Sequence, residues 1–124
     1  MAEILLIDDM ALVRGAITAI LTRGGHSVTE AKTAAAGIAL LRRRRFDLVI
    51  TDVLMPERDG NDVVLFLDAM AERPPVLSIS GGATGIPAIE ALRLSRERAS
   101  AVMTKPFVNR ELLATVDQLL SVRA

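Results

Sequence analysis

The sequence predicts a single α/β domain in which a parallel sheet of five strands carries helices on both faces. Short apolar runs of strand length alternate five times with longer segments of helical spacing, which is the pattern of consecutive strand–helix units. The first and third runs are almost wholly apolar, as expected of strands that helices cover on both sides. A length of 124 residues suits one domain.

The first half of the chain supplies three strands and two helices. We expect strands over residues 4–7, 27–29 and 48–51, and helices over residues 10–23 and 33–44. Gly24-Gly25 ends the first helix, because glycine favours the position after a helix C-terminus. Thr33 is placed to cap the N-terminus of the second helix.

The second half completes the alternation. We expect strands over residues 76–79 and 101–104, and helices over residues 63–70, from Pro87 onward and over residues 112–120. Pro74-Pro75 ends the first of these helices, and Pro87 suits the first turn of the next.

Composition excludes several classes of function. Fifteen basic and fifteen acidic residues give no net charge, so no global attraction to nucleic acid or membranes is predicted. The absence of cysteine excludes disulfides, thiolate catalysis and cysteine zinc sites. No apolar stretch reaches the ~20 residues of a membrane span, and Glu3 stands where a secretory signal needs basic charge. We therefore expect a cytoplasmic protein, with residues 1–124 forming one domain and no attached output domain.

Polar residues follow four of the five predicted strands at the point where each strand ends. Asp8 and Asp9 follow the first, Asp52 the third, Ser80 the fourth and Lys105 the fifth. Parallel strands joined by right-handed crossovers end on one edge of the sheet. In the flavodoxin-like strand order 2-1-3-4-5, strands one and three flank the switch point where ligands bind. These side chains are therefore expected to share one cleft.

Such a set of residues suits phosphoryl chemistry. Three neighbouring carboxylates repel one another unless a cation joins them, and hard oxygen ligands suit Mg²⁺. The Lys105 ammonium and a bound cation can hold the charge of a phosphoryl group, and the Ser80 hydroxyl can donate a hydrogen bond to it. A carboxylate such as Asp52 can attack phosphorus and form an acyl phosphate.

These residues also resemble a known family, the bacterial response regulator receiver domains, over the whole chain. The shared features, in order along the chain, are Asp8-Asp9, Asp52-Val53-Leu54-Met55-Pro56 with Gly60 after it, Ser80, and Lys105-Pro106-Phe107. Each is weak alone, but together, and each at a strand end, they are specific.

The resemblance implies a role for each residue. Asp52 would be the phosphoacceptor, and Asp9 and Asp52 would bind Mg²⁺ directly. The backbone carbonyl of Leu54 would be a third ligand, and Asp8 would act through water. Lys105 would contact the phosphoryl group, and Ser80 would move towards it on activation.

The resemblance also implies partners. The phosphoryl donor would be a histidine kinase or a histidine phosphotransfer protein, and the output would pass through protein contacts, with the domain monomeric or dimerising on phosphorylation.

The Lys105–Pro106 bond would be cis. Val102 stands where most relatives have an aromatic residue that rotates on activation, and valine cannot make the same rotamer change. Leu54 and Gly82 occupy positions that tune hydrolysis of the acyl phosphate, and neither can orient water, which predicts slow self-dephosphorylation.

Other functions fit the sequence less well. An aspartyl phosphatase would carry a second aspartate two residues after Asp52, where this chain has Leu54; we therefore expect a phosphoacceptor that catalyses its own phosphorylation and dephosphorylation, and not a turnover enzyme. A flavin carrier of similar topology would need a phosphate-binding loop after strand one, where two carboxylates stand. A pseudo-receiver adaptor that works without phosphorylation stays as the alternative.

Some of these features also have simpler structural interpretations. The acidic pair could cap the first helix. His26 is interpreted as a solvated edge residue, and Arg42–Arg45 as cations favoured at a helix C-terminus, with partner docking as the lesser alternative.

Overall fold

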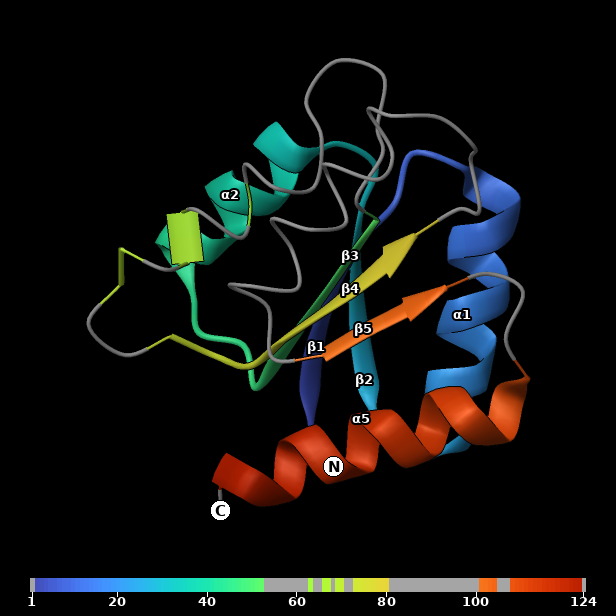
Figure 1. Ribbon diagram of the computed structural model, residues 1–124. Coiled ribbons are helices and arrows are strands. Elements are labelled where there is room, and N and C mark those ends of the chain that lie inside the picture. Colours follow the sequence, from blue (N-terminus) through green and yellow to red (C-terminus); the bar gives the residue numbers. More distant parts are fainter. Residues whose placement is uncertain are drawn as a thin grey trace.

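The computed structural model describes residues 2–52, 63, 66, 67, 69, 70, 73–80, 101–104 and 108–123. Its five strands form one parallel sheet in the order β2-β1-β3-β4-β5 (Figure 1), which confirms the predicted topology. The strands are β1 (Glu3–Ile7), β2 (Ser27–Ala31), β3 (Leu48–Asp52), β4 (Val76–Ser80) and β5 (Ala101–Thr104). The labelled helices are α1 (Ala11–Arg23), α2 (Ala34–Arg43) and α5 (Asn109–Arg123).

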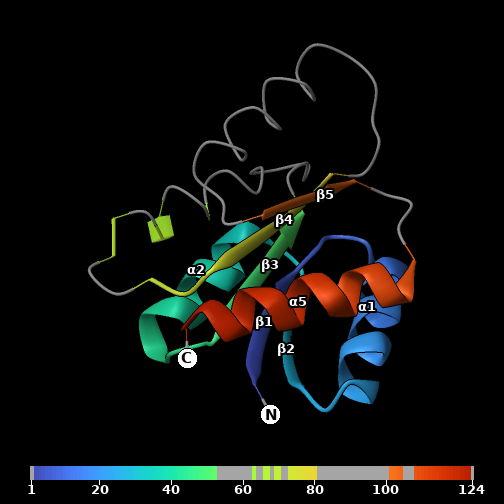
Figure 2. The same cartoon turned by 60° about the horizontal axis from the view of Figure 1, so that its bottom comes forward.

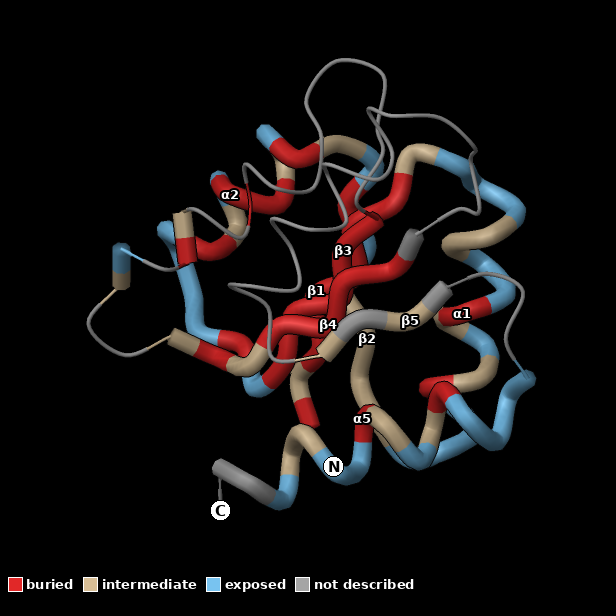
Figure 3. The backbone as a smooth tube through the Cα atoms, in the orientation of Figure 1, coloured by how far each residue is buried: buried red, intermediate tan, exposed pale blue. Residues whose placement is uncertain are grey.

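Helices cover both faces of this sheet. Because side chains alternate along a strand, Leu5 and Ile7 of β1 join the apolar core beneath α2, whereas Ile4 and Leu6 join the core beneath α1 and α5. Figure 2 shows α1 and α5 on one side of the sheet and α2 on the other. The buried residues concentrate along the central strands β1, β3 and β4 (Figure 3). The predicted three-layer arrangement is therefore confirmed.

Local signals predicted in the sequence fix two helix ends. Gly25 adopts a φ of +90°, and the next amide, that of His26, donates to the Leu21 carbonyl at 3.1 Å, which closes the C-terminus of α1. Thr33 caps α2, since its hydroxyl accepts the Ala36 N–H at 3.0 Å.

β2 is longer than predicted. The strand runs on through Glu30 and Ala31, where only three residues were expected. It is an edge strand in which Ala31 alone is buried, so its sequence carries little apolar pattern. The extra length brings Glu30 beside the first helix.

The interpretation of His26 as a solvated edge residue is wrong. Its side chain is only 9% exposed, and Nε2 lies 3.3 Å from Asp117 Oδ1 on α5. The two residues are separated by 91 positions, so no local pattern predicts the contact.

Several predicted features lie outside the described residues. They are the metal-ligand role of Leu54, the positions of Gly82 and Lys105, the cis bond before Pro106 and the helix after Pro87. Within the described residues, none of the helices combines the length and the apolar character needed to cross a bilayer.

Gly37 allows α2 to pack closely on β1. A Cβ at this position would lie 2.7 Å from Ile7 Cγ1 and closer still to Cδ1. We expect Gly37→Ala to lower the free energy of unfolding by roughly 1–2 kcal/mol, because overpacking outweighs the ~1 kcal/mol gain in helix propensity. Urea unfolding followed by circular dichroism measures the change.

Gly15 in α1 provides the matched control. A Cβ there would meet nothing within 4 Å, so Gly15→Ala should raise the free energy of unfolding by about 0.5–1 kcal/mol. Equal effects at the two glycines would show that contact with Ile7 does not decide the outcome.

Candidate functional site

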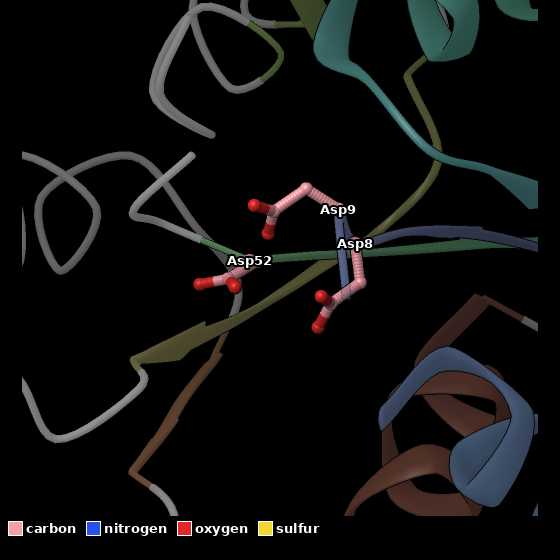
Figure 4. Close-up of side chains that lie close together, drawn as sticks. All are labelled: Asp8, Asp9 and Asp52. Atoms are coloured by element: carbon pink, nitrogen blue, oxygen red, sulfur yellow. The ribbon is translucent and has the colours of Figure 1, made fainter. Parts of the chain in front are cut away.

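Three carboxylates meet at the carboxyl edge of the sheet. β1 pairs with β3 so that Ile7 lies opposite Thr51, and the residues that follow, Asp8 and Asp52, therefore emerge side by side. One carboxylate oxygen from each of Asp8, Asp9 and Asp52 lies within 4.8 Å of the others. Figure 4 shows the three side chains at the adjoining ends of β1 and β3. The predicted convergence of these aspartates is confirmed.

The site concentrates negative charge in a partly dry environment. Asp8 is 1% and Asp52 5% exposed, whereas Asp9 is more accessible. Carboxylates taken out of water beside one another are costly unless a positive charge compensates them. The arrangement therefore favours binding of a cation that enters from the side of Asp9.

The donor set fits a small hard cation. All three groups are carboxylates, and the cluster contains no nitrogen or sulfur ligand. Mg²⁺ holds oxygen ligands at about 2.0–2.1 Å, so opposite ligands span about 4.2 Å. The separations of up to 4.8 Å are wider than this by only a fraction of an ångström, which side-chain rotation or a bridging water can supply.

Asp8 also has a structural role. Its Oδ1 accepts the Met10 N–H at 2.9 Å, at the start of α1. The residue in the N-cap position, Met10, offers no side-chain cap of its own. Helix capping therefore accounts for one oxygen of Asp8, but it does not account for Asp9 or Asp52.

Arg14 joins the end of β1 to its neighbours. Its Nη1 donates to the Asp8 backbone carbonyl at 2.8 Å, and its Nε donates to Glu30 Oε1 at 2.9 Å. The side chain is 17% exposed, against 40% for Glu30. Sequence reasoning missed this residue, because an arginine in a helix facing an acidic residue of another strand carries no local signal.

We expect Arg14→Met to lower the free energy of unfolding by about 1–2 kcal/mol, because a charge-assisted hydrogen bond to the Asp8 carbonyl is lost. Chemical unfolding measures the change. Glu30→Gln is the control, because it keeps the hydrogen bond from Arg14 to Asp8 and alters only the partly exposed pair of Arg14 with Glu30. Its effect on the free energy of unfolding should therefore stay below ~1 kcal/mol. A larger loss of stability in the Glu30 variant would show that the pair of Arg14 with Glu30, and not the bond to Asp8, provides the stabilisation.

The other predicted site residues are placed only in part. Ser80 is the last residue of β4 and lies opposite Thr104, the last residue of β5. β4 pairs with β3 so that Ile79 lies opposite Asp52, which sets the end of β4 beside the carboxylates. Lys105 follows Thr104 in the sequence and lies outside the described residues.

Comparison with known proteins identifies the family. The sequence matches the response regulator receiver domain over residues 4–117. The chain belongs to this family. As a receiver domain, it is a signalling module of two-component systems, whose members act by phosphoryl acceptance.

Curated relatives agree with this assignment. The receiver domain is 34% identical to the response regulator protein FleR of Pseudomonas aeruginosa over 93% of this chain and 24% of FleR. It is 31% identical to protein PilH of the same organism over 98% of this chain and 99% of PilH, and 32% identical to protein PetR of Rhodobacter capsulatus over 95% of this chain. The chain thus spans about a quarter of FleR and 48% of PetR, but nearly all of PilH.

Solved structures share the fold. A response regulator receiver domain from Clostridium thermocellum superposes with a TM-score of 0.87 at 23% identity, covering 99% of this chain and 97% of that one. The signal receiver domain of a histidine kinase from Syntrophus aciditrophicus gives 0.86 at 27% identity, covering 98% and 91%.

Proposed function

We propose that Asp52 is the residue of this receiver domain that accepts the phosphoryl group. The observation that carries the proposal is the carboxylate of Asp52 at the end of β3, 5% exposed and within 4.8 Å of the carboxylates of Asp8 and Asp9. Of the three aspartates, only Asp52 is itself part of a strand, the central strand β3, which ends at the carboxyl edge of the sheet.

The transfer conserves atoms and charge. An oxygen of Asp52 forms a bond to phosphorus while the bond from phosphorus to the donor breaks, and the donor keeps that electron pair. For a phosphohistidine the leaving imidazole nitrogen takes up a proton from water, and for acetyl phosphate the leaving group is acetate. The product is an acyl phosphate on Asp52.

Magnesium fits the residues present. Asp9 and Asp52 would bind Mg²⁺ directly and Asp8 through water, with the Leu54 carbonyl as a further ligand by family resemblance. When bound, the ion neutralises charge that develops on the phosphoryl oxygens. Asp8 keeps its hydrogen bond to the Met10 amide, which holds its carboxylate at the edge of the cluster.

Lys105 and Ser80 complete the proposed site. Lys105 would pair with the phosphoryl oxygens, and Ser80 would donate a hydrogen bond to them. The end of β4 lies beside the carboxylates, as the pairing of Asp52 with Ile79 shows, and this placement supports the role of Ser80. With Leu54 and Gly82 unable to orient water, the acyl phosphate should hydrolyse slowly.

The remaining parts of the proposal concern the wider system. The phosphoryl donor is a histidine kinase or a histidine phosphotransfer protein, and the target is a protein that residues 1–124 contact as one receiver domain. The domain catalyses its own phosphorylation and dephosphorylation but does not turn over a substrate repeatedly. It acts in the cytoplasm and binds neither nucleic acid nor a membrane. It is a monomer or dimerises on phosphorylation. The zero net charge supports the absence of polyanion binding.

Incubation with acetyl phosphate and Mg²⁺ tests the proposal. Intact mass spectrometry should show one added phosphoryl group per chain, and a phosphate-release assay should show no sustained turnover. An unmodified chain under all conditions would favour the pseudo-receiver alternative, and continuous phosphate release would favour a phosphatase.

A further inference from the structure

Four consecutive arginines lie at the edge of the sheet opposite to Asp52. The arginine patch, Arg42–Arg45, spans the end of α2 and the start of the segment that leads into β3, and all four residues are exposed. β3 begins at Leu48 and ends at Asp52, so the patch and the carboxylates occupy opposite ends of that strand. Since the chain has no net charge, this is a local concentration of positive charge.

A pocket adjoins the patch. It has a volume of about 280 Å³ and is lined by the arginines together with apolar residues that include Phe46, Met70 and Pro74. Phe46 and Pro74 are buried, so the apolar wall belongs to the folded core. Its volume is close to the lower end of the ~300–1,000 Å³ of ligand sites, and its apolar wall offers a contact for an apolar side chain of a peptide.

Two of the arginines are held in place by aromatic rings. The guanidinium carbon of Arg44 lies 4.6 Å from the centroid of Phe46, and that of Arg42 lies 5.4 Å from the centroid of Phe66. Arg44 also pairs with Glu3 at 3.1 Å. Contact with a ring face restricts a guanidinium without using its N–H groups, and a restricted guanidinium favours bidentate binding of a carboxylate.

Helix electrostatics explain only part of this arrangement. Cations in the last turn of α2 are favoured by the helix dipole, and Arg42 and Arg43 stand there. The dipole accounts for neither Arg45, which lies beyond the helix, nor the apolar pocket beside the patch. Among the described residues, no carboxylate forms an ion pair with Arg42 or Arg43.

We propose that the arginine patch and its pocket bind an acidic peptide segment of a partner protein. An apolar side chain of the segment enters the pocket, and flanking carboxylates pair with Arg42 and Arg43. Charge complementarity selects an acidic ligand, and the apolar wall of the pocket favours a peptide over nucleic acid or an anionic membrane, which present no isolated apolar side chain. The surface lies away from Asp52, so this proposal does not rest on the proposed phosphoryl chemistry.

A titration of the ¹⁵N-labelled chain tests the proposal. The probe is a synthetic peptide with one leucine between two pairs of glutamates. Saturable shifts are expected at the amides of Phe46 and Met70, and not at those of Asp8 and Asp9. A second peptide with serine in place of the leucine should bind more weakly, because it leaves the pocket empty.

Matched charge reversals supply the controls. Arg43→Glu should weaken binding about tenfold, equivalent to ~1.4 kcal/mol, whereas Arg23→Glu should change it less than twofold. Arg23 is likewise exposed and in the last turn of a helix, that of α1. Arg43→Gln, a milder change, should give an intermediate loss, and unfolding curves of all three confirm that they fold.

Equal weakening by the Arg23 and Arg43 variants would overturn the proposal, as would shifts centred outside the patch or no saturation by the acidic peptide. A DNA duplex or phosphatidylglycerol vesicles that bind more tightly than the peptide would overturn the choice of a protein partner. Arg43→Glu should still accept phosphate from acetyl phosphate at the wild-type rate. Failure of peptide binding is therefore distinguishable from failure of the proposed phosphoryl site.

Discussion

Asp52→Asn will gain no phosphoryl group under conditions in which the unaltered domain gains one. An amide at this position keeps the size of the side chain but is not a nucleophile towards phosphorus. The substitution also removes one of three neighbouring negative charges, so the variant should unfold at the same or a higher denaturant concentration. Loss of the adduct would then reflect chemistry and not misfolding.

Intact mass spectrometry after incubation with acetyl phosphate and Mg²⁺ measures the result. Asp117→Asn is the control, because this aspartate is 67% exposed and contacts His26 on the far side of the fold. The control should be modified as fully as the unaltered chain. A phosphoryl group on the Asp52→Asn protein would move the acceptor to another residue.

Asp9→Asn should weaken Mg²⁺ binding at least ~10- to 100-fold, because it replaces a charged ligand that is open to solvent with a neutral one. Asp8→Asn should have a smaller effect. The amide oxygen can still accept the Met10 N–H, and the proposed contact of Asp8 with the ion passes through water. The order of the two effects separates a direct ligand from an indirect one.

Isothermal titration with MgCl₂ is the suitable measurement, since the chain contains no tryptophan or tyrosine whose fluorescence could report binding. Asp117→Asn again serves as the control. Chelation of the metal should also stop phosphoryl acceptance by the unaltered domain. Equal affinities in the Asp9 variant and the unaltered protein would contradict the proposed ligand set.

The strands and the acidic cluster were predictable for related reasons. Apolar runs such as Ile4–Ile7 mark buried parallel strands, and parallel topology brings the ends of such strands to one edge. Asp8, Asp9 and Asp52 could therefore be placed together without knowledge of any contact between them. The helix-end roles of Thr33 and Gly25 were equally predictable, since a helix cap depends only on residues within the same turn.

Contacts between side chains distant in sequence could not be predicted. The bridge from Arg14 to Glu30, the pair of His26 with Asp117 and the stacking of Arg42 on Phe66 each join different elements. Their formation depends on helix rotation and register, which periodicity does not specify. The arginine run was visible in the sequence, but its pocket was not, because Met70 and Pro74 come from a later part of the chain.

Paramagnetic relaxation by Mn²⁺ tests most directly whether carboxylates from two strands share one cation. At substoichiometric Mn²⁺, the amide signals of Asp8, Asp9 and Asp52 should broaden first in the ¹⁵N-labelled protein. The signals of Ser27 and Asp47, at the opposite edge of the sheet, should persist. Broadening centred elsewhere, or uniform broadening of all amides, would contradict a shared site at the ends of β1 and β3.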